Sequence, residues 1–160
     1  MIILLMGVSG SGKTTIGQLL ARSLNWEFYD GDSFHSLENI EKMRVGIPLN
    51  DDDRIPWLQT LQAAIKKWLK ENRNVVLACS ALKDSYRQIL LIDSQIQLIY
   101  LQGSLDLIQQ RLQERQNHFM NEKLLKSQFD VLEKPDNAIC VDVFTPPEII
   151  VEHIRMVLEI

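Results

Sequence analysis

Gly7-Val8-Ser9-Gly10-Ser11-Gly12-Lys13-Thr14 is the stretch that decides the fold of this chain. It fits the phosphate-binding pattern G-x-x-x-x-G-K-[ST]. Residues 2–6 ahead of it are all apolar and predict a buried strand, and residues 14–24 behind it carry apolar side chains at helical spacing. The order strand, glycine-rich turn and helix is the context that this pattern requires.

The glycines of this loop allow its backbone N–H groups to converge on a phosphate, because no Cβ stands in the way. The helix that follows adds unpaired donors and a partial positive charge at its N-terminus. Lys13 can reach the β- and γ-phosphates, and the Thr14 hydroxyl can bind Mg²⁺. A flexible turn is the plainer interpretation, but the full pattern favours nucleotide binding by Gly7, Val8, Ser9, Gly10, Ser11, Gly12, Lys13, Thr14 and Thr15.

The length of 160 residues predicts one domain, residues 1–160, with a hydrophobic core. Hydrophobic residues make up 46% of the chain and charged residues 24%, which is usual for a globular protein. The net charge of −4 and a pI near 5.4 argue against general binding to nucleic acids or anionic membranes. Any anionic ligand must therefore be bound by a local cluster of cations.

No run of the sequence approaches the ~18 apolar residues of a membrane span. The apolar start is only about six residues long and has no basic segment, so we do not expect a signal peptide, and we expect a cytoplasmic protein. Cys79 and Cys140 lie in apolar, strand-like runs and are predicted to be buried free thiols. Neither cysteine has a second ligand at a zinc-like spacing.

Two carboxylates follow the next predicted strand, residues 25–29, in the run Asp30-Gly31-Asp32. They point the same way if the chain stays extended. A solvated Asp-Gly turn is the alternative. The strand predicted at 75–79 ends without an acid at Ser80, so this pair is the best source of negative charge near a metal. A phosphoryl acceptor also needs a base, and the pair can supply one.

The rest of the chain alternates strands with helices and contains no internal repeat. Further strands are predicted at 75–79, 95–101 and 138–143. Helices are predicted at 33–44, about 54–71, from 80 onward, 104–115, 124–132 and from 145 onward. Asn50–Asp53 is predicted to be an acidic loop that caps the helix after it, and Thr145–Glu148 fits a capping box.

Three groups of cations invite a functional interpretation. Arg54 stands at a helix start, where the helix dipole disfavours a cation, although a pair with an adjacent aspartate would also explain it. Lys83 and Arg87 are four residues apart after the strand at 75–79, where an open α/β sheet binds its ligands. Arg111 and Arg115 are also four apart, beside a polar stretch that predicts a mobile lid at about 116–130. Favourable cations at a helix C-terminus explain the last pair equally well.

The chain resembles the small gluconokinases, within the wider set of P-loop metabolite kinases that includes shikimate and nucleoside monophosphate kinases. The resemblance extends from residue 2 to about residue 143. The chain departs from the family pattern at two positions. Thr14 replaces the more frequent serine, which leaves the chemistry unchanged. Ser36 replaces a proline that often follows the histidine, and this bears only on the shape of the local loop. The runs that carry the resemblance are Met6–Lys13, Asp30-Gly31-Asp32, Asn39-Ile40, Lys42-Met43, Gly46, Pro48-Leu49, Asp53-Arg54, Pro56-Trp57-Leu58, Cys79–Lys83, Tyr86-Arg87, Arg111, Arg115, His118-Phe119-Met120, Leu124-Leu125, Ser127-Gln128-Phe129 and Leu132-Glu133.

This resemblance implies an α/β P-loop kinase fold: a five-stranded parallel sheet with helices on both faces and a mobile lid. It implies transfer of the γ-phosphoryl group of ATP to the 6-hydroxyl of D-gluconate, with Mg²⁺ as cofactor. It leaves a homodimer open. The implied roles are phosphate binding by Lys13, metal binding by Thr14 and Asp30, proton acceptance by Asp32, substrate binding by His35, Arg54, Lys83 and Arg87, and charge neutralisation by Arg111 and Arg115.

Two other functions remain open from the residues. A shikimate-like or other sugar-acid acceptor would use the same loop and the same types of side chain. A nucleotide-gated binding module would need the loop alone. The concentration of cations and carboxylates around the predicted site argues against such a module, because binding alone does not require it.

Overall fold

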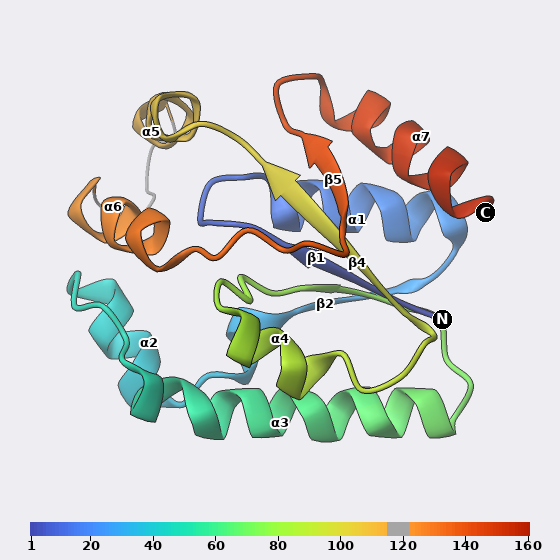
Figure 1. Cartoon of the computed structure of the whole chain (residues 1–160), viewed down its shortest axis with the longest axis horizontal. Helices are drawn as coiled ribbons and strands as arrows, with labels where there is room; N and C mark the ends of the chain where they lie inside the picture. The colour runs from blue at the N-terminus through green and yellow to red at the C-terminus, as the bar shows by residue number, and fades with distance from the viewer. Residues whose placement is uncertain (115–121) are drawn as a thin grey trace.

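The computed structural model describes residues 1–114 and 122–160 as a layered α/β domain (Figure 1). Its centre is a five-stranded sheet in the order β2-β3-β1-β4-β5, and every paired strand is parallel to its neighbour. The predicted five-stranded parallel sheet is confirmed. The strands are β1 (Ile2–Met6), β2 (Glu27–Asp30), β3 (Val75–Ala78), β4 (Ile96–Gln102) and β5 (Ile139–Asp142).

Helices cover both faces of the sheet, because each parallel connection has to cross from one end of the sheet to the other. In Figure 1, α3 and α4 lie below the sheet, α1 and α7 lie above it, and α2, α5 and α6 gather at the left. The helices are α1 (Lys13–Leu24), the 3₁₀ helix η1 (Gly31–Phe34), α2 (Leu37–Arg44), α3 (Asp51–Lys70), α4 (Asp84–Leu90), α5 (Leu105–Glu114), α6 (Glu122–Val131) and α7 (Pro147–Leu158).

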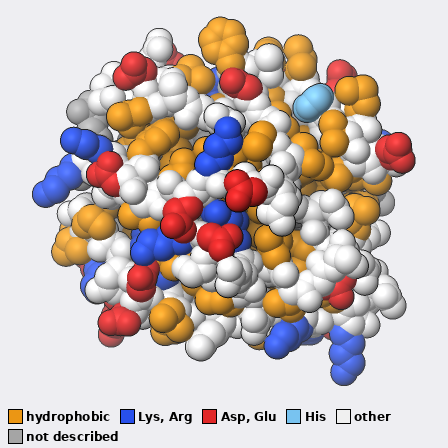
Figure 2. Space-filling model, viewed as in Figure 1, with side chains coloured by type: hydrophobic (Ala, Val, Ile, Leu, Met, Phe, Trp, Pro, Cys, Tyr) orange, Lys and Arg blue, Asp and Glu red, His pale blue; other side chains and the backbone are white. Residues whose placement is uncertain are grey.

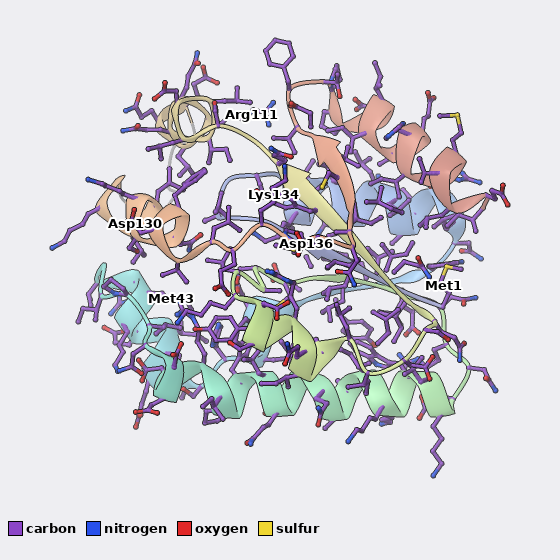
Figure 3. The ribbon with its side chains drawn as sticks, viewed as in Figure 1. Met1, Met43, Arg111, Asp130, Lys134 and Asp136 are labelled. Atoms are coloured by element: carbon purple, nitrogen blue, oxygen red, sulfur yellow. The ribbon has the colours of Figure 1, made fainter. Side chains whose placement is uncertain are left out.

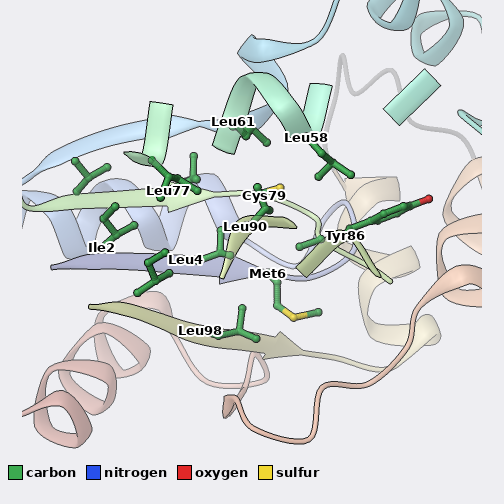
Figure 4. Close-up of a cluster of buried hydrophobic side chains, with 14 of the residues drawn as sticks. Ile2, Leu4, Met6, Leu58, Leu61, Leu77, Cys79, Tyr86, Leu90 and Leu98 are labelled. Atoms are coloured by element: carbon green, nitrogen blue, oxygen red, sulfur yellow. The ribbon is translucent and has the colours of Figure 1, made fainter. Parts of the chain in front are cut away.

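The central strand β1 is apolar throughout because both of its faces are buried. Ile2, Leu4 and Met6 pack against the α3 and α4 side, in the cluster that Figure 4 shows with Leu58, Leu61 and Leu90. Ile3 and Leu5 point to the other face and pack with residues of α1 and α7. Two cores therefore sandwich the sheet, and they fix where its carboxyl edge lies.

A third, smaller cluster joins the phosphate loop to the helices at that edge. Val8 of the loop packs with Ile108 and Leu112 of α5 and with Leu125 of α6. These contacts bring α5 and α6 against the loop by apolar packing. The predicted lid, about 116–130, begins in a segment outside the described residues, and its described part lies within α6.

Several local predictions differ from the structure. The predicted acidic loop at Asn50–Asp53 is instead the cap and first turn of α3, because Asn50 and Asp53 form a reciprocal capping box. The capping box predicted at Thr145–Glu148 is wrong: Pro146 is the N-cap of α7, and its side chain has no donor or acceptor to offer. The helix predicted at 33–44 is divided into η1 and α2, since the Ser36 side chain caps a new start.

The two cysteines have different environments. Cys79 is buried, as predicted, and burial raises its pKa to about 12, so it stays a thiol at neutral pH. Cys140 is exposed, so the prediction of a buried thiol there is wrong. The reason is its place on the edge strand β5, on the opposite face from the buried Val141.

Charges of both signs lie on the face of the molecule that Figure 2 shows. Acidic and basic side chains lie next to one another near its centre instead of separating by sign. None of the helices in the described ranges combines the length and the hydrophobicity that a membrane crossing requires.

Candidate active site

The phosphate loop connects β1 to α1 and turns at glycines with positive φ. Gly12 is the N-cap of α1 with φ +96°, and no side chain caps the helix. Gly10 has φ +83°, and a Cβ there would lie 2.9 Å from the Leu112 side chain. Both positions therefore require glycine. The uncapped helix start provides N–H groups for an anion.

Lys13 lies against the loop that it follows. Its ammonium donates to the backbone oxygens of Gly7 at 2.8 Å and Val8 at 2.9 Å. Burial lowers the pKa of Lys13, and the nearby Asp32 carboxylate opposes that shift. The side chain is thus held with its charge in the loop, where a phosphate would find it.

Thr14 and Asp30 bring two oxygen ligands together beside the loop. The Thr14 hydroxyl donates to Asp30 Oδ2 at 3.2 Å, and Asp30 is the last residue of β2. The described residues contain no group of three His, Cys, Asp or Glu that could hold a metal. A hydroxyl and a carboxylate suit a hard cation that takes its other ligands from phosphates and water, as Mg²⁺ does. The residues present fit that ion.

Next to the loop lies a cavity that we call the main cavity. It joins the phosphate loop to the ends of β2 and β3, the region of α2 and the start of α3. It is lined by Ser9, Lys13, Asp32, His35, Met43, Pro48, Leu49, Arg54, Trp57, Ser80, Leu82, Leu124, Ser127 and Gln128. The structure thus gathers Lys13, Asp32, His35 and Arg54, four of the predicted site residues, around one space.

Asp32 lines this cavity from η1. The Asp30 side chain accepts a hydrogen bond of 3.0 Å from the Asp32 backbone N–H, which fixes the turn between the two aspartates. Partial desolvation raises the pKa of Asp32, Lys13 opposes the rise, and the negative charge of Asp30 adds to it. The side chain is still 63% exposed, so water reaches it as well. A carboxylate with a raised pKa is a better proton acceptor.

Arg54 reaches the main cavity from the first turn of α3. Its guanidinium donates to the Tyr86 hydroxyl at 3.2 Å and lies 5.5 Å from the centre of the Tyr86 ring. The Tyr86 hydroxyl in turn donates to Asp51. Figure 4 shows the Tyr86 ring running out of the buried cluster with its oxygen at the far end. Tyr86 therefore connects the apolar core to the cation of the cavity.

The alternative explanation of Arg54, a pair with Asp51 or Asp53, does not hold, because both carboxylates pair with lysines. Lys83 donates to Asp51 at 2.9 Å, and Lys42 to Asp53 at the same distance. Arg54 lines the cavity with Tyr86 as its partner. Lys83 lies beside this group, bound to Asp51, and does not line the cavity.

Arg87 does not reach the cavity either. It is 3% exposed, and its guanidinium donates to the backbone oxygens of Ala81 at 2.9 Å and Leu82 at 3.1 Å. Arg87 lies one turn into α4, from where it reaches back to the loop before that helix. Arg87 therefore holds the loop that presents Leu82 to the cavity.

Arg111 lies on the other side of the phosphate loop. It donates to the backbone oxygen of Val143 at 2.5 Å and lines a second space, the loop-side cavity. Figure 3 shows Arg111 on α5, far from Met43 of α2, which lines the main cavity. The loop-side cavity is also lined by Gly10, Ser11, Gly12, Thr15, Ile16, Val143, Phe144, Thr145, Pro146, Pro147 and Ile150. Arg115 lies outside the described residues.

Comparison with known proteins identifies the family. A shikimate kinase family profile matches residues 9–156. A probable gluconokinase of Xenopus tropicalis is 45% identical, over 97% of this chain and 92% of that protein. A solved structure of a gluconokinase from Sinorhizobium meliloti is 42% identical, with a TM-score of 0.82 over 94% of this chain and 86% of that one. The chain belongs to the gluconokinase family.

The fold of this gluconokinase family member matches solved kinases over nearly its full length. An unliganded sugar kinase structure from Janibacter sp. superposes with a TM-score of 0.92, at 40% identity, over 99% of this chain and 94% of that one. The P-loop kinase fold is thereby confirmed, and so is the resemblance to gluconokinases. The match to the shikimate kinase profile is consistent with the wider set in which the sequence placed the chain.

The structure adds residues that the sequence pattern did not single out for the site. Gln128 of α6 lines the main cavity, and its side-chain oxygen accepts a hydrogen bond of 2.7 Å from the Ser9 backbone N–H. Trp57 lines it too, and its indole donates to the backbone oxygen of Gly31 at 2.8 Å. The helical spacing of the sequence predicted the helices that carry these two residues, α6 and α3. It gave no indication that Gln128 would contact the phosphate loop or that Trp57 would line the cavity.

Proposed function

We propose that this chain transfers the γ-phosphoryl group of ATP to the 6-hydroxyl of D-gluconate, giving 6-phospho-D-gluconate and ADP. Membership of the gluconokinase family supports the reaction. The observation that supports the site most strongly is the main cavity, which is lined by the phosphate-loop lysine Lys13, the carboxylate of Asp32 and the guanidinium of Arg54.

The nucleotide would bind with its phosphates on the loop. The N–H groups from Gly7 to Thr15 would surround them, with the Ser9 N–H released from the Gln128 side chain. Lys13 would exchange its bonds to the Gly7 and Val8 oxygens for phosphate oxygens. The base and ribose would occupy the loop-side cavity, next to Arg111. The γ-phosphate would then face the main cavity, where the acceptor would bind.

Thr14 and Asp30 would hold Mg²⁺, which neutralises phosphate charge when it is bound. Both side chains lie at the start of α1 and the end of β2, so their oxygens face the same point beside the loop.

Gluconate would lie in the main cavity with its carboxylate toward Arg54, since a guanidinium fork suits a carboxylate. Asp32 would accept the proton of the 6-hydroxyl as its oxygen attacks the γ-phosphorus. The new O6–P bond forms as the bond between the γ-phosphorus and the bridging oxygen breaks, and ADP leaves with that electron pair.

Lys83 and Arg87 contribute indirectly in this proposal. Lys83 neutralises Asp51, so that Asp51 accepts from Tyr86 without drawing Arg54 away from the cavity. Arg87 fixes the loop at Ala81 and Leu82. A role of Arg111 and Arg115 in charge neutralisation, a cytoplasmic location and a homodimer stay predictions from the sequence.

A shikimate-like acceptor and a binding-only module are not favoured, because relatives that cover most of the chain are gluconokinases. The test is ADP release in a coupled assay with gluconate, shikimate, other sugar acids and nucleoside monophosphates as acceptors. ADP release that depends on gluconate supports the proposal. Release that depends on a different acceptor, or that no acceptor stimulates, contradicts it.

A further inference from the structure

His35 is held from two sides where the main cavity meets α2. Its ring stacks on Trp57, with 4.1 Å between ring centres and 16° between ring planes. Its side chain is only 3% exposed. Burial, followed by the positive charge of Arg54, lowers the pKa of His35 to about 4. The imidazole is therefore neutral at pH 7, and one of its two nitrogens carries a proton while the other accepts.

Asn39, a buried residue of α2, decides which nitrogen that is. Its side-chain nitrogen Nδ2 donates to the backbone oxygen of Asp53 at 2.8 Å. A carbonyl oxygen only accepts hydrogen bonds, so the nitrogen end of the carboxamide must face it. The second proton of the same nitrogen faces His35 Nδ1 at 3.2 Å. Nδ1 is thereby the acceptor, and the proton of the ring lies on Nε2.

The Nε2 end of the ring faces Asp32. Asp32 Oδ1 lies 3.9 Å from Nε2, beyond hydrogen-bond distance, and both residues line the main cavity. A donor and an acceptor at this separation suit an oxygen that accepts from one and donates to the other. A hydroxyl group does both, whereas a carboxylate would be repelled by Asp32.

We propose that Asn39 is a positioning residue that keeps His35 in its Nε2–H tautomer, so that His35 and Asp32 together bind one hydroxyl of the acceptor. This rests on the proposed sugar-acid substrate and extends it. Arg54 selects the carboxylate end of the acceptor, and the His35–Asp32 pair selects a hydroxyl. Asn39 acts through His35 and touches no substrate.

The tautomer can be measured without any activity. The ¹⁵N shifts of the His35 ring in a long-range ¹H–¹⁵N spectrum distinguish a protonated Nε2 from a protonated Nδ1, and His35→Gln assigns the signal. The proposal expects Nε2–H in the unmodified protein. Nδ1–H there would overturn it, whichever variants fold. This result is independent of the gluconate reaction, so the failure of one is distinguishable from the failure of the other.

Kinetics of matched variants complete the test. Asn39→Ala should mix the two tautomers and lower kcat/KM for gluconate about tenfold, while the KM for ATP stays unchanged. Asn74→Ala, which removes an exposed asparagine bound to the N-terminus, is the control. His35→Gln keeps an amide donor near the Nε2 position and should retain more activity than His35→Ala. Unchanged tautomer and kinetics in Asn39→Ala, or equal losses in the two His35 variants, would contradict the proposal.

Discussion

The backbone N–H of Ser9 donates a hydrogen bond of 2.7 Å to the side-chain oxygen of Gln128. Ser9 belongs to the phosphate loop and Gln128 to α6, which is also attached to the loop through the contact of Leu125 with Val8. A phosphate oxygen that takes up this N–H has to displace the Gln128 oxygen. Nucleotide binding and the position of the Gln128 side chain are thereby coupled.

Gln128→Ala should therefore strengthen ATP binding. The loss of one competing hydrogen bond, about 0.5–1.5 kcal/mol net, corresponds to a roughly two- to tenfold lower Kd. Isothermal titration calorimetry with ATP measures it, and Gln110→Ala, at an exposed position of α5, is the matched control. Weaker binding in Gln128→Ala would instead show that Gln128 contributes to the bound state.

Asp32→Asn should abolish most turnover and leave ATP binding intact. Asparagine keeps the size of the side chain but cannot take the proton of the attacking hydroxyl, so kcat should fall by about 10²- to 10⁴-fold. Steady-state kinetics and the Kd for ATP give the two readouts. Asp52→Asn, at an exposed position of α3, should behave like the unmodified protein. Near-normal turnover of Asp32→Asn would remove Asp32 as the base.

Tyr86→Phe tests how Arg54 is held. The change removes the hydroxyl that Arg54 and Asp51 share and keeps the buried ring. We expect the KM for gluconate to rise about fivefold, because one hydrogen bond to a charged group is lost, with little change in the KM for ATP. Arg54→Ala should have the same selectivity and a larger effect. Tyr29→Phe removes a hydroxyl that binds Arg73 away from the cavity and serves as the control. A rise in both KM values would contradict a role specific to gluconate.

The buried His35 predicts a pH dependence of stability. Its pKa is about 4 in the folded chain and 6.5 as the ordinary value, so between these pH values the unfolded chain binds a proton that the folded chain does not. The free energy of unfolding therefore falls as the pH is lowered from 6.5 to 4, by roughly 3 kcal/mol for this group. Urea unfolding of the unmodified protein and of His35→Gln across this window measures the difference.

The matched control for this measurement is His153→Gln, because His153 is exposed on α7. It should keep the pH dependence of the unmodified protein, whereas His35→Gln should lose a part of it. Identical slopes in all three proteins would mean that His35 titrates normally in the folded chain.

The sequence predicted the layered fold well because its signals are local. An apolar run of five residues, a glycine loop and a helical repeat define the first strand, loop and helix, and parallel strands impose the crossovers. The predicted burial of Cys140 was wrong because an apolar run does not indicate whether its strand lies at the edge of the sheet. The assignment of Asn50–Asp53 to a loop was wrong because acidic residues are common both in loops and in the first turn of a helix.

The site was less predictable, because it depends on which residues meet across the sheet edge. The sequence motifs predicted Lys13, Asp32 and Arg54 as site residues, and all three line one cavity in the structure. Spacing on α4 suggested that Lys83 and Arg87 act together, but Lys83 pairs with Asp51 and Arg87 binds its own loop. The link from Asp53 through Asn39 to His35 joins two helices and leaves no periodic signal in the sequence.

The most direct test of the reaction is the identity of its product. ATP and ¹³C-labelled gluconate are incubated with the purified protein, and ³¹P–¹³C coupling in the NMR spectrum shows which carbon carries the phosphate. Our account predicts a single product with phosphorus coupled to C6, formed by the unmodified protein and nearly absent with Asp32→Asn. Phosphorus on another carbon, or no phosphorylated gluconate at all, would contradict it.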